Sequence, residues 1–89
     1  MTDDTSIQFD NDVQFDGECV IVWAVTEQRR IKCTIPRATV HSVPKFSDLI
    51  TREINRDRRE IVDRLRTILV AKIAEAGTDT VELLPLDLI

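Results

Sequence analysis

Aromatic residues, glycine and cysteine are all scarce in this sequence, and each shortage excludes particular classes of protein. The 89 residues include one tryptophan, three phenylalanines and no tyrosine. The core must therefore be built from Ile, Val and Leu, and stacking platforms for nucleobases are few. Two glycines leave little material for a loop that cradles phosphate. The two cysteines lack the spacing of metal ligands, so the sequence predicts free thiols and neither a metal site nor another cofactor.

Long hydrophobic runs are absent as well. The longest runs from Cys19 to Val25, far too short to span a bilayer. The chain opens Met-Thr-Asp-Asp, without a basic and then apolar leader, so we expect a soluble, cytoplasmic protein that does not bind membranes. Its length predicts a single domain over 1–89, with residues 1–6 disordered.

Charge is unevenly distributed along the chain. Residues 1–28 carry seven acids and no base, residues 29–72 carry all twelve bases with five acids, and residues 73–89 add four acids. The net charge of −4 therefore conceals a basic middle between two acidic ends. We interpret this pattern as acidic strands folding over a basic helix.

Alternating apolar residues in the first 35 positions predict an N-terminal antiparallel β-meander. Asp16-Gly17 is a two-residue hairpin signal, and residues 26–29 favour a four-residue loop. This loop sets Val22 opposite Cys33 and places one apolar set on a common face. The members of that set are Val13, Phe15, Val20, Val22, Ala24, Ile31, Cys33 and Ile35.

The opposite face of the same strands carries an apolar series beside polar residues. It holds Ile21 and Trp23 next to Arg30 and Lys32. Either the N-terminal segment or the tail covers Trp23, or the face is exposed and forms an interface. In the same register Cys19 lies opposite Pro36, too far from Cys33 for a disulfide.

Helical spacing dominates the rest of the chain. Residues 36–42 predict a short helix, and Ser47 resembles the N-cap of a long helix that ends near Gly77. One uninterrupted helix of that length would reach about 45 Å, so it must bend, break near Asn55-Arg56, or extend beyond the domain. Thr80 to Leu84 predict a short final strand. The fold class is α+β, with the long helix packed on the sheet.

Four arginines form a stripe on the long helix. They are Arg52, Arg56, Arg59 and Arg66. Carboxylates at i,i+4 spacing predict ion pairs that blunt the stripe: Asp48/Arg52, Arg56/Glu60, Arg59/Asp63 and Glu60/Arg64. The stripe is typical of a solvated helix face, and the alternative is a surface that binds nucleic-acid phosphates.

The sequence argues against two kinds of site, a calcium-binding loop and a reactive thiol. An acidic run begins at Asp10, but Phe15 stands where a calcium loop requires glycine. Cys33 and His41 could share a hydrogen-bond network, although nothing in the sequence activates the thiol. A thiol enzyme therefore ranks below the other classes, and the chain is expected not to be an enzyme.

The order and spacing of several segments resemble a small bacterial family known as domain of unknown function 1488. The segments are VIVWAV, IKCTI, PRATV, INRDRREI and VELLPLD. The resemblance spans about Ile7 to Asp87 and implies a compact α+β domain with an antiparallel sheet and helices packed against it. Pro36 and Ile54 depart from the pattern, which has a small capping residue and a bulkier aromatic there. The resemblance supplies neither a function nor a site residue.

These observations predict a non-enzymatic protein-interaction or accessory module, possible partners being a second copy or another protein. The expected contact residues are Ile21, Trp23, Leu69 and Ile73, the last two on the surplus of the long helix. A nucleic-acid-associated regulator that uses the arginine stripe is the alternative function.

Overall fold

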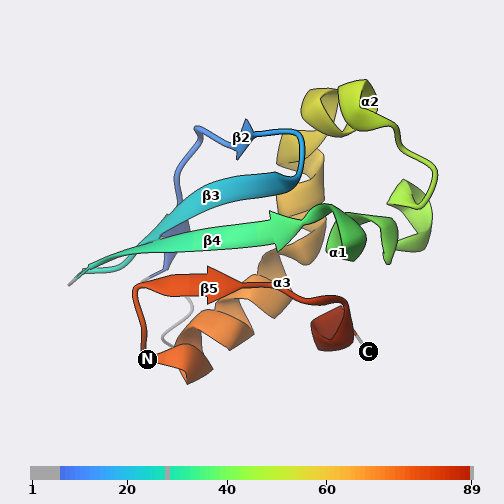
Figure 1. The fold of residues 1–89 in the computed structure, drawn as a ribbon. Helices are drawn as coiled ribbons and strands as arrows, with labels where there is room; N and C mark the ends of the chain where they lie inside the picture. Colours follow the sequence, from blue (N-terminus) through green and yellow to red (C-terminus); the bar gives the residue numbers. More distant parts are fainter. Residues whose placement is uncertain (1–6, 28, 89) are drawn as a thin grey trace.

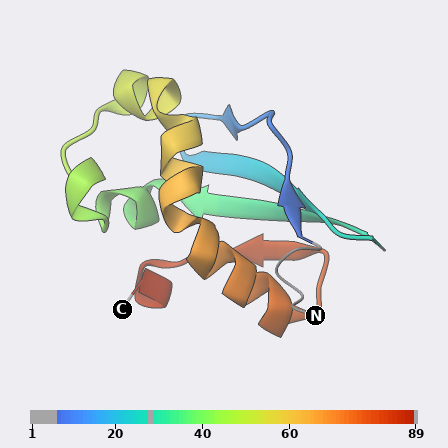
Figure 2. The same ribbon diagram turned by 180° about the vertical axis from the view of Figure 1, so that it is seen from behind.

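The computed structural model describes residues 7–27 and 29–88, and the expected disorder of residues 1–6 lies outside these described residues. Figure 1 shows a twisted sheet with helices behind it, and Figure 2 shows the long helix crossing the sheet from the other side. The elements are β1 (Gln8–Phe9), β2 (Gln14–Phe15), β3 (Cys19–Val25), β4 (Arg30–Pro36), α1 (Arg37–His41), η2 (Pro44–Phe46), α2 (Thr51–Arg56), α3 (Arg58–Ala76), β5 (Thr80–Glu82) and η3 (Pro85–Leu88). This arrangement confirms the α+β fold.

The register of the central hairpin is the predicted one. Val22 pairs with Cys33, and Cys19 pairs with Pro36, so the two cysteines are apart and both are free. Val25 pairs with Arg30, which leaves the predicted four-residue loop. Register was predictable because a slip of one residue would have turned every buried side chain to the other face.

The first hairpin has a longer loop than expected. Phe15 pairs with Val20, so four residues lie between these paired residues where the Asp16-Gly17 signal suggested two. The Asp16 carboxylate accepts hydrogen bonds from the backbone N–H groups of Glu18 (2.9 Å) and Cys19 (2.8 Å), and Gly17 has φ 98°. A side chain that bonds the backbone two and three residues ahead stabilises this wider turn.

The sheet is mixed, not purely antiparallel. Its order is β1-β3-β4-β5, with β2 also paired to β3, and β5 runs parallel to β4. The final strand is therefore confirmed but ends earlier than predicted, at Glu82. The parallel direction follows from the connection, because the helices return the chain to the end of the sheet from which β4 started.

The long helix is broken, which is one of the three alternatives that the sequence left open. Asp57 separates α2 from α3 with φ −98° and ψ 12°. Gly77 ends α3 in the left-handed conformation, φ 65°, as predicted. With 19 residues α3 is about 28 Å long, which fits within the longest extent of the molecule, 39 Å.

The predicted N-cap at Ser47 is wrong. Its hydroxyl donates to the carbonyl of Pro44 (3.0 Å) and ends the short turn η2. The helix begins four residues later, after Ile50, whose N–H is satisfied by the Glu53 carboxylate (3.0 Å). This contact is the glutamate half of a capping box, in which a carboxylate at the third helical position accepts from the N-cap N–H.

The core lies between the sheet and α3. Buried apolar side chains from the inner face of the strands meet the buried face of the helix. On the strands these residues are Val20, Val22, Ala24, Ile31, Cys33, Ile35 and Val81, and Val13 joins them from the residue before β2. On α2 and α3 they are Ile54, Ile61, Val62, Leu65, Leu69 and Ile73. The prediction that Leu69 and Ile73 contact a partner is therefore wrong. Both are buried in the core, because the break lets the whole of α3 pack on the sheet.

Candidate protein interface on the uncovered sheet face

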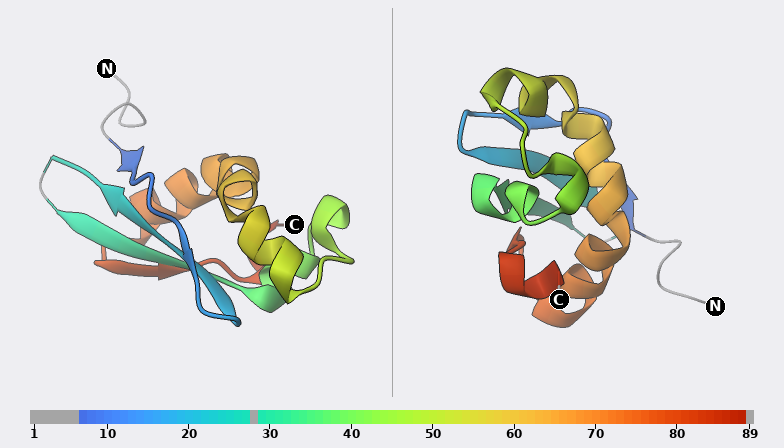
Figure 3. Two further views of the ribbon diagram at one scale, coloured as in Figure 1. Left: turned by 90° about the horizontal axis from the view of Figure 1, so that it is seen from above. Right: turned by 90° about the vertical axis from the view of Figure 1, so that its right-hand side faces the viewer.

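Strand alternation gives the sheet a second face that no described helix covers. Seen from above in Figure 3, the helices gather on one side of the sheet. In Figure 1 the described chain leaves β3, β4 and β5 unobstructed toward the viewer. We call this surface the outer face. Its residues are Cys19, Ile21, Trp23 and Val25 of β3, Arg30, Lys32 and Thr34 of β4, and Thr80 and Glu82 of β5.

The four residues from β3 form an apolar stripe along the outer face. Cys19, Ile21 and Trp23 are half-buried, and 39% of Val25 is exposed. None of them belongs to the core or packs against it. A row of apolar side chains next to solvent is unusual on a sheet whose other face already supplies the core.

The Arg30 guanidinium stacks on the indole ring of Trp23. The guanidinium carbon of Arg30 lies 4.8 Å from the centre of the indole ring, and the same guanidinium is 3.9 Å from an Asp10 carboxylate oxygen. Arg30 is the diagonal neighbour of Trp23 across the β3–β4 pair, within reach of a long side chain. Alternation along the strands predicts both residues on this face; the stacking was not predicted, and its only signal in the sequence is the diagonal position of Arg30.

The two ends of the apolar stripe differ in charge. Burial raises the pKa of the Cys19 thiol, and the nearby carboxylates of Asp16, Glu82 and Glu18 raise it further. The Cys19 end is therefore acidic. Arg30 lies at the Val25 end, where it pairs with Asp10 (3.9 Å) while Arg29 pairs with Asp79 (3.5 Å), so that end carries charges of both signs.

Lys32 lies between those ends. It pairs with Trp23 on one side and with Thr80 on the other. Glu82, by contrast, lies in the next row toward the acidic end, beside Thr34. Lys32 and Glu82 thus place opposite charges in neighbouring rows of the outer face.

The arginine stripe does not form the ion pairs predicted for it. Arg56 bonds Asp57 (3.0 Å), Glu60 pairs with Lys45, and Asp48 lies outside the helix. None of the four expected pairs occurs among the described residues. The i,i+4 rule failed because the break at Asp57 and the turn at Lys45 supplied closer partners.

The stripe arginines nevertheless differ in their surroundings. Arg52, Arg56, Arg59 and Arg66 are all exposed. Arg66 lies 5.5 Å from the centre of the Phe9 ring, and it borders a hollow with Asp10, Asp63 and Arg59. These carboxylates reduce the positive potential there.

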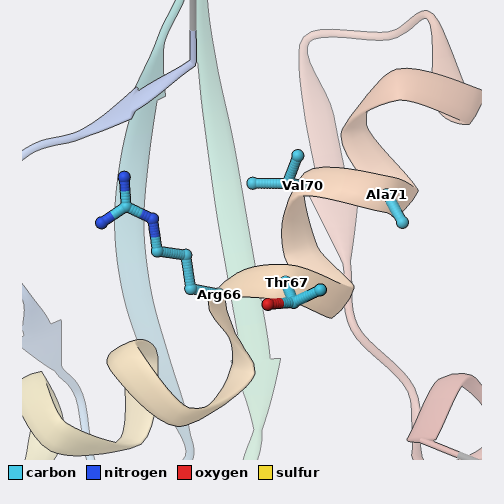
Figure 4. Close-up of a pocket in the computed structure, with 4 residues that line it drawn as sticks. All are labelled: Arg66, Thr67, Val70 and Ala71. Carbon is cyan, nitrogen blue, oxygen red and sulfur yellow. The ribbon is translucent and has the colours of Figure 1, made fainter. Parts of the chain in front are cut away.

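A second hollow on α3 has little chemical character. Figure 4 shows its lining, in which Arg66 points toward β1 while Thr67 and Ala71 face another way. One hydroxyl and one guanidinium do not define a binding site for a particular ligand. The hollow is therefore not a candidate for the functional site.

The Cys33 and His41 side chains make separate interactions. Cys33 is fully buried, its thiol directed at the Ile31 carbonyl (3.8 Å), and burial raises its pKa to about 11. The His41 imidazole Nε2 instead contacts the Leu49 carbonyl (3.0 Å). A thiol held in its protonated form is a poor nucleophile, so this arrangement gives no support to thiol chemistry.

Residues 7–27 and 29–88 contain no cluster of three or more His, Cys, Asp or Glu side chains that could hold a metal ion. The same residues include no helix that is both long enough and apolar enough to cross a membrane. The chain matches no protein-family model, no curated protein and no solved structure. The resemblance to domain of unknown function 1488 therefore stays a prediction.

Proposed function

We propose that this chain is a non-enzymatic protein-interaction module, accessory or regulatory in kind, which binds a protein partner through its outer face. The observation that carries the proposal is the apolar stripe outside the core, with Trp23 at its centre beneath Arg30. Tryptophan and arginine are the side chains most often responsible for binding energy in protein interfaces. A polar surround of Lys32, Thr34 and Glu82 adjoins the stripe, as a rim adjoins an interface core.

Site-specific photo-crosslinking tests this proposal. We would place p-benzoylphenylalanine at Val25 of the outer face and, as a control, at exposed Thr67 on α3. Irradiation of cells that express each variant, followed by mass spectrometry, should give a protein adduct from position 25 and little from position 67. Equal yields from both positions, or no protein adduct from position 25, would contradict the proposal.

A nucleic-acid-associated regulator is the second candidate. It is favoured by the absence, within the described residues, of the ion pairs expected to neutralise Arg52 and Arg59, both of which are exposed. Uncompensated arginines bind phosphates and release counterions, so binding would weaken as salt rises.

Fluorescence anisotropy of labelled DNA and RNA over a salt series tests that candidate. Arg52→Ala/Arg59→Ala should lower the salt slope by about 1–2, since each phosphate contact contributes roughly 0.9 for duplex DNA. Arg29→Ala/Arg30→Ala removes the same charge from the sheet and is the matched control. Absence of binding even at low salt would eliminate the candidate.

A further inference from the structure

We infer that the partner of the outer face is a second copy of this chain, packed face to face about a two-fold axis that crosses the strands. The inference rests on the proposed function and names the partner that the outer face fits. It follows from the order of the rows on that face and from the opposite charges of Lys32 and Glu82 in neighbouring rows.

Strand pairing divides the outer face into rows. One row contains Trp23, Lys32 and Thr80. The next row contains Ile21, Thr34 and Glu82. The centre of the apolar stripe lies between these two rows, because Val25 and Cys19 lie one row beyond them in either direction.

A two-fold axis through that centre, perpendicular to the strands, places each row over the other row of the second copy. Trp23 then lies over the partner copy's Ile21, and the two apolar stripes cover each other along their length. Facing sheets pack about 10 Å apart with their strands nearly aligned, so interleaved side chains of this size fill the space.

The same axis makes the charges complementary. Lys32 faces the partner copy's Thr34, next to that copy's Glu82. The symmetry repeats the contact, giving two lysine–glutamate pairs.

The alternative axis, parallel to the strands, lacks this complementarity. It would place each row over the same row of the second copy, so that the lysine rows face each other and the glutamate rows face each other. Like charges that face each other across an interface cost binding energy. An isologous contact requires a surface complementary to itself, and opposite charges in neighbouring rows supply that property in one orientation only.

Charge reversal with complementation tests the inference. Wild-type protein should sediment at twice the 10.2 kDa of a single chain. Lys32→Glu and Glu82→Lys should each weaken self-association about tenfold or more, because each variant homodimer brings two like-charged pairs together. An equimolar mixture of the two variants should recover the dimer, since each copy then supplies the charge that the other needs.

Controls separate this result from misfolding and from general charge effects. Circular dichroism should show that both variants remain folded, and Arg64→Glu, an equal reversal on exposed α3, should leave the dimer intact. A wild-type monomer at millimolar concentration, or a mixture that stays monomeric, would overturn the inference.

Sedimentation and crosslinking together separate failure of the inference from failure of the proposed function. If the wild type is a monomer but position 25 crosslinks to a different protein, the inference fails and the proposed function stands. If position 25 yields no protein adduct at all, the proposed function fails, and the inference that rests on it fails as well.

Discussion

The two faces of the sheet come from alternating residues of the same strands, yet they meet different surroundings. On the inner face Ile31 and Cys33 are fully buried beneath α3. On the outer face Ile21 and Trp23, in the neighbouring strand, are half-buried with no described helix above them. The inner face is therefore completed by the chain itself, whereas the outer face has apolar area that the monomer leaves uncovered. Apolar alternation on one face of a strand therefore indicates a core, whereas apolar residues on both faces indicate that the second face contacts something beyond the core.

A matched pair of isoleucines tests the comparison most strongly. Ile31→Ala should reduce the free energy of unfolding by about 2–5 kcal/mol, since it removes fully buried methyl groups and leaves a cavity. Ile21→Ala should cost about 1 kcal/mol or less in dilute protein, because its side chain lies outside the core. Urea denaturation measures both values, and equal losses would erase the distinction between the faces.

The alkylation rates of the two cysteines compare the same two faces. Cys19 is half-buried on the outer face, whereas Cys33 is fully buried with its pKa raised to about 11. We expect iodoacetamide to modify Cys19 in the folded protein and Cys33 only after denaturation. A pKa raised by two from the usual 9.0 alone lowers the thiolate fraction about a hundredfold. Mass spectrometry of timed digests measures both rates, and fast labelling of Cys33 would contradict the burial of the inner face.

Alkaline pH should weaken the inner face selectively. The Cys33 thiol has a raised pKa in the folded state, so its contribution is complete below the unfolded value near 9.0 and is lost as the pH rises toward 11. The expected loss is at most about 2–3 kcal/mol. Cys33→Ala should abolish this part of the pH dependence and Cys19→Ala should leave most of it, as measured by urea denaturation from pH 8 to about pH 11.

Acid should produce the smallest effect, on the covered side of the sheet. Lys72 of α3 pairs with Asp87 of η3, and this bond lowers the pKa of the Asp87 carboxyl, as does the N–H of Leu84. A lowered pKa stabilises the fold above the unfolded value of 3.8, and the contribution disappears as the pH falls through the folded pKa. Asp87→Asn should therefore be slightly less stable than wild type at neutral pH and equal to it in strong acid.

Lys72→Gln is the matched variant for this prediction, because it removes the other half of the same ion pair. Thermal denaturation at neutral pH and at about pH 2 should give the same pattern for both variants. A difference from wild type that persists unchanged in acid would assign the effect to packing of η3 instead of to the ion pair.

Sequence alone was sufficient where one strong pattern governed the outcome. The β3–β4 register followed from alternation together with the loop length, since a slip of one residue would bury Lys32 or expose Val22. Gly77 ended the helix because glycine adopts positive φ without cost. These features depend on residues close in sequence or on a single consistent apolar face.

Sequence was insufficient where two local signals competed or where distant segments met. Ser47 is an ordinary N-cap residue, yet the helix begins after Ile50, where Glu53 caps the backbone. Glu60 had Arg56 and Arg64 at helical spacing and pairs with Lys45. The direction of β5 depends on how the broken helix returns the chain, which periodicity does not encode.

The parallel attachment of β5 also bears on the order in which the molecule assembles. Thr80 pairs with Lys32 across a stretch of chain that includes every described α-helix, whereas the β3–β4 hairpin closes over a four-residue loop. Contacts between distant residues close large loops and form late in folding. We expect β5 to join last and, by the same reasoning, to detach first. Its departure would bare the hydrogen-bonding edge of β4, turning a small local opening into a template for strand exchange between molecules.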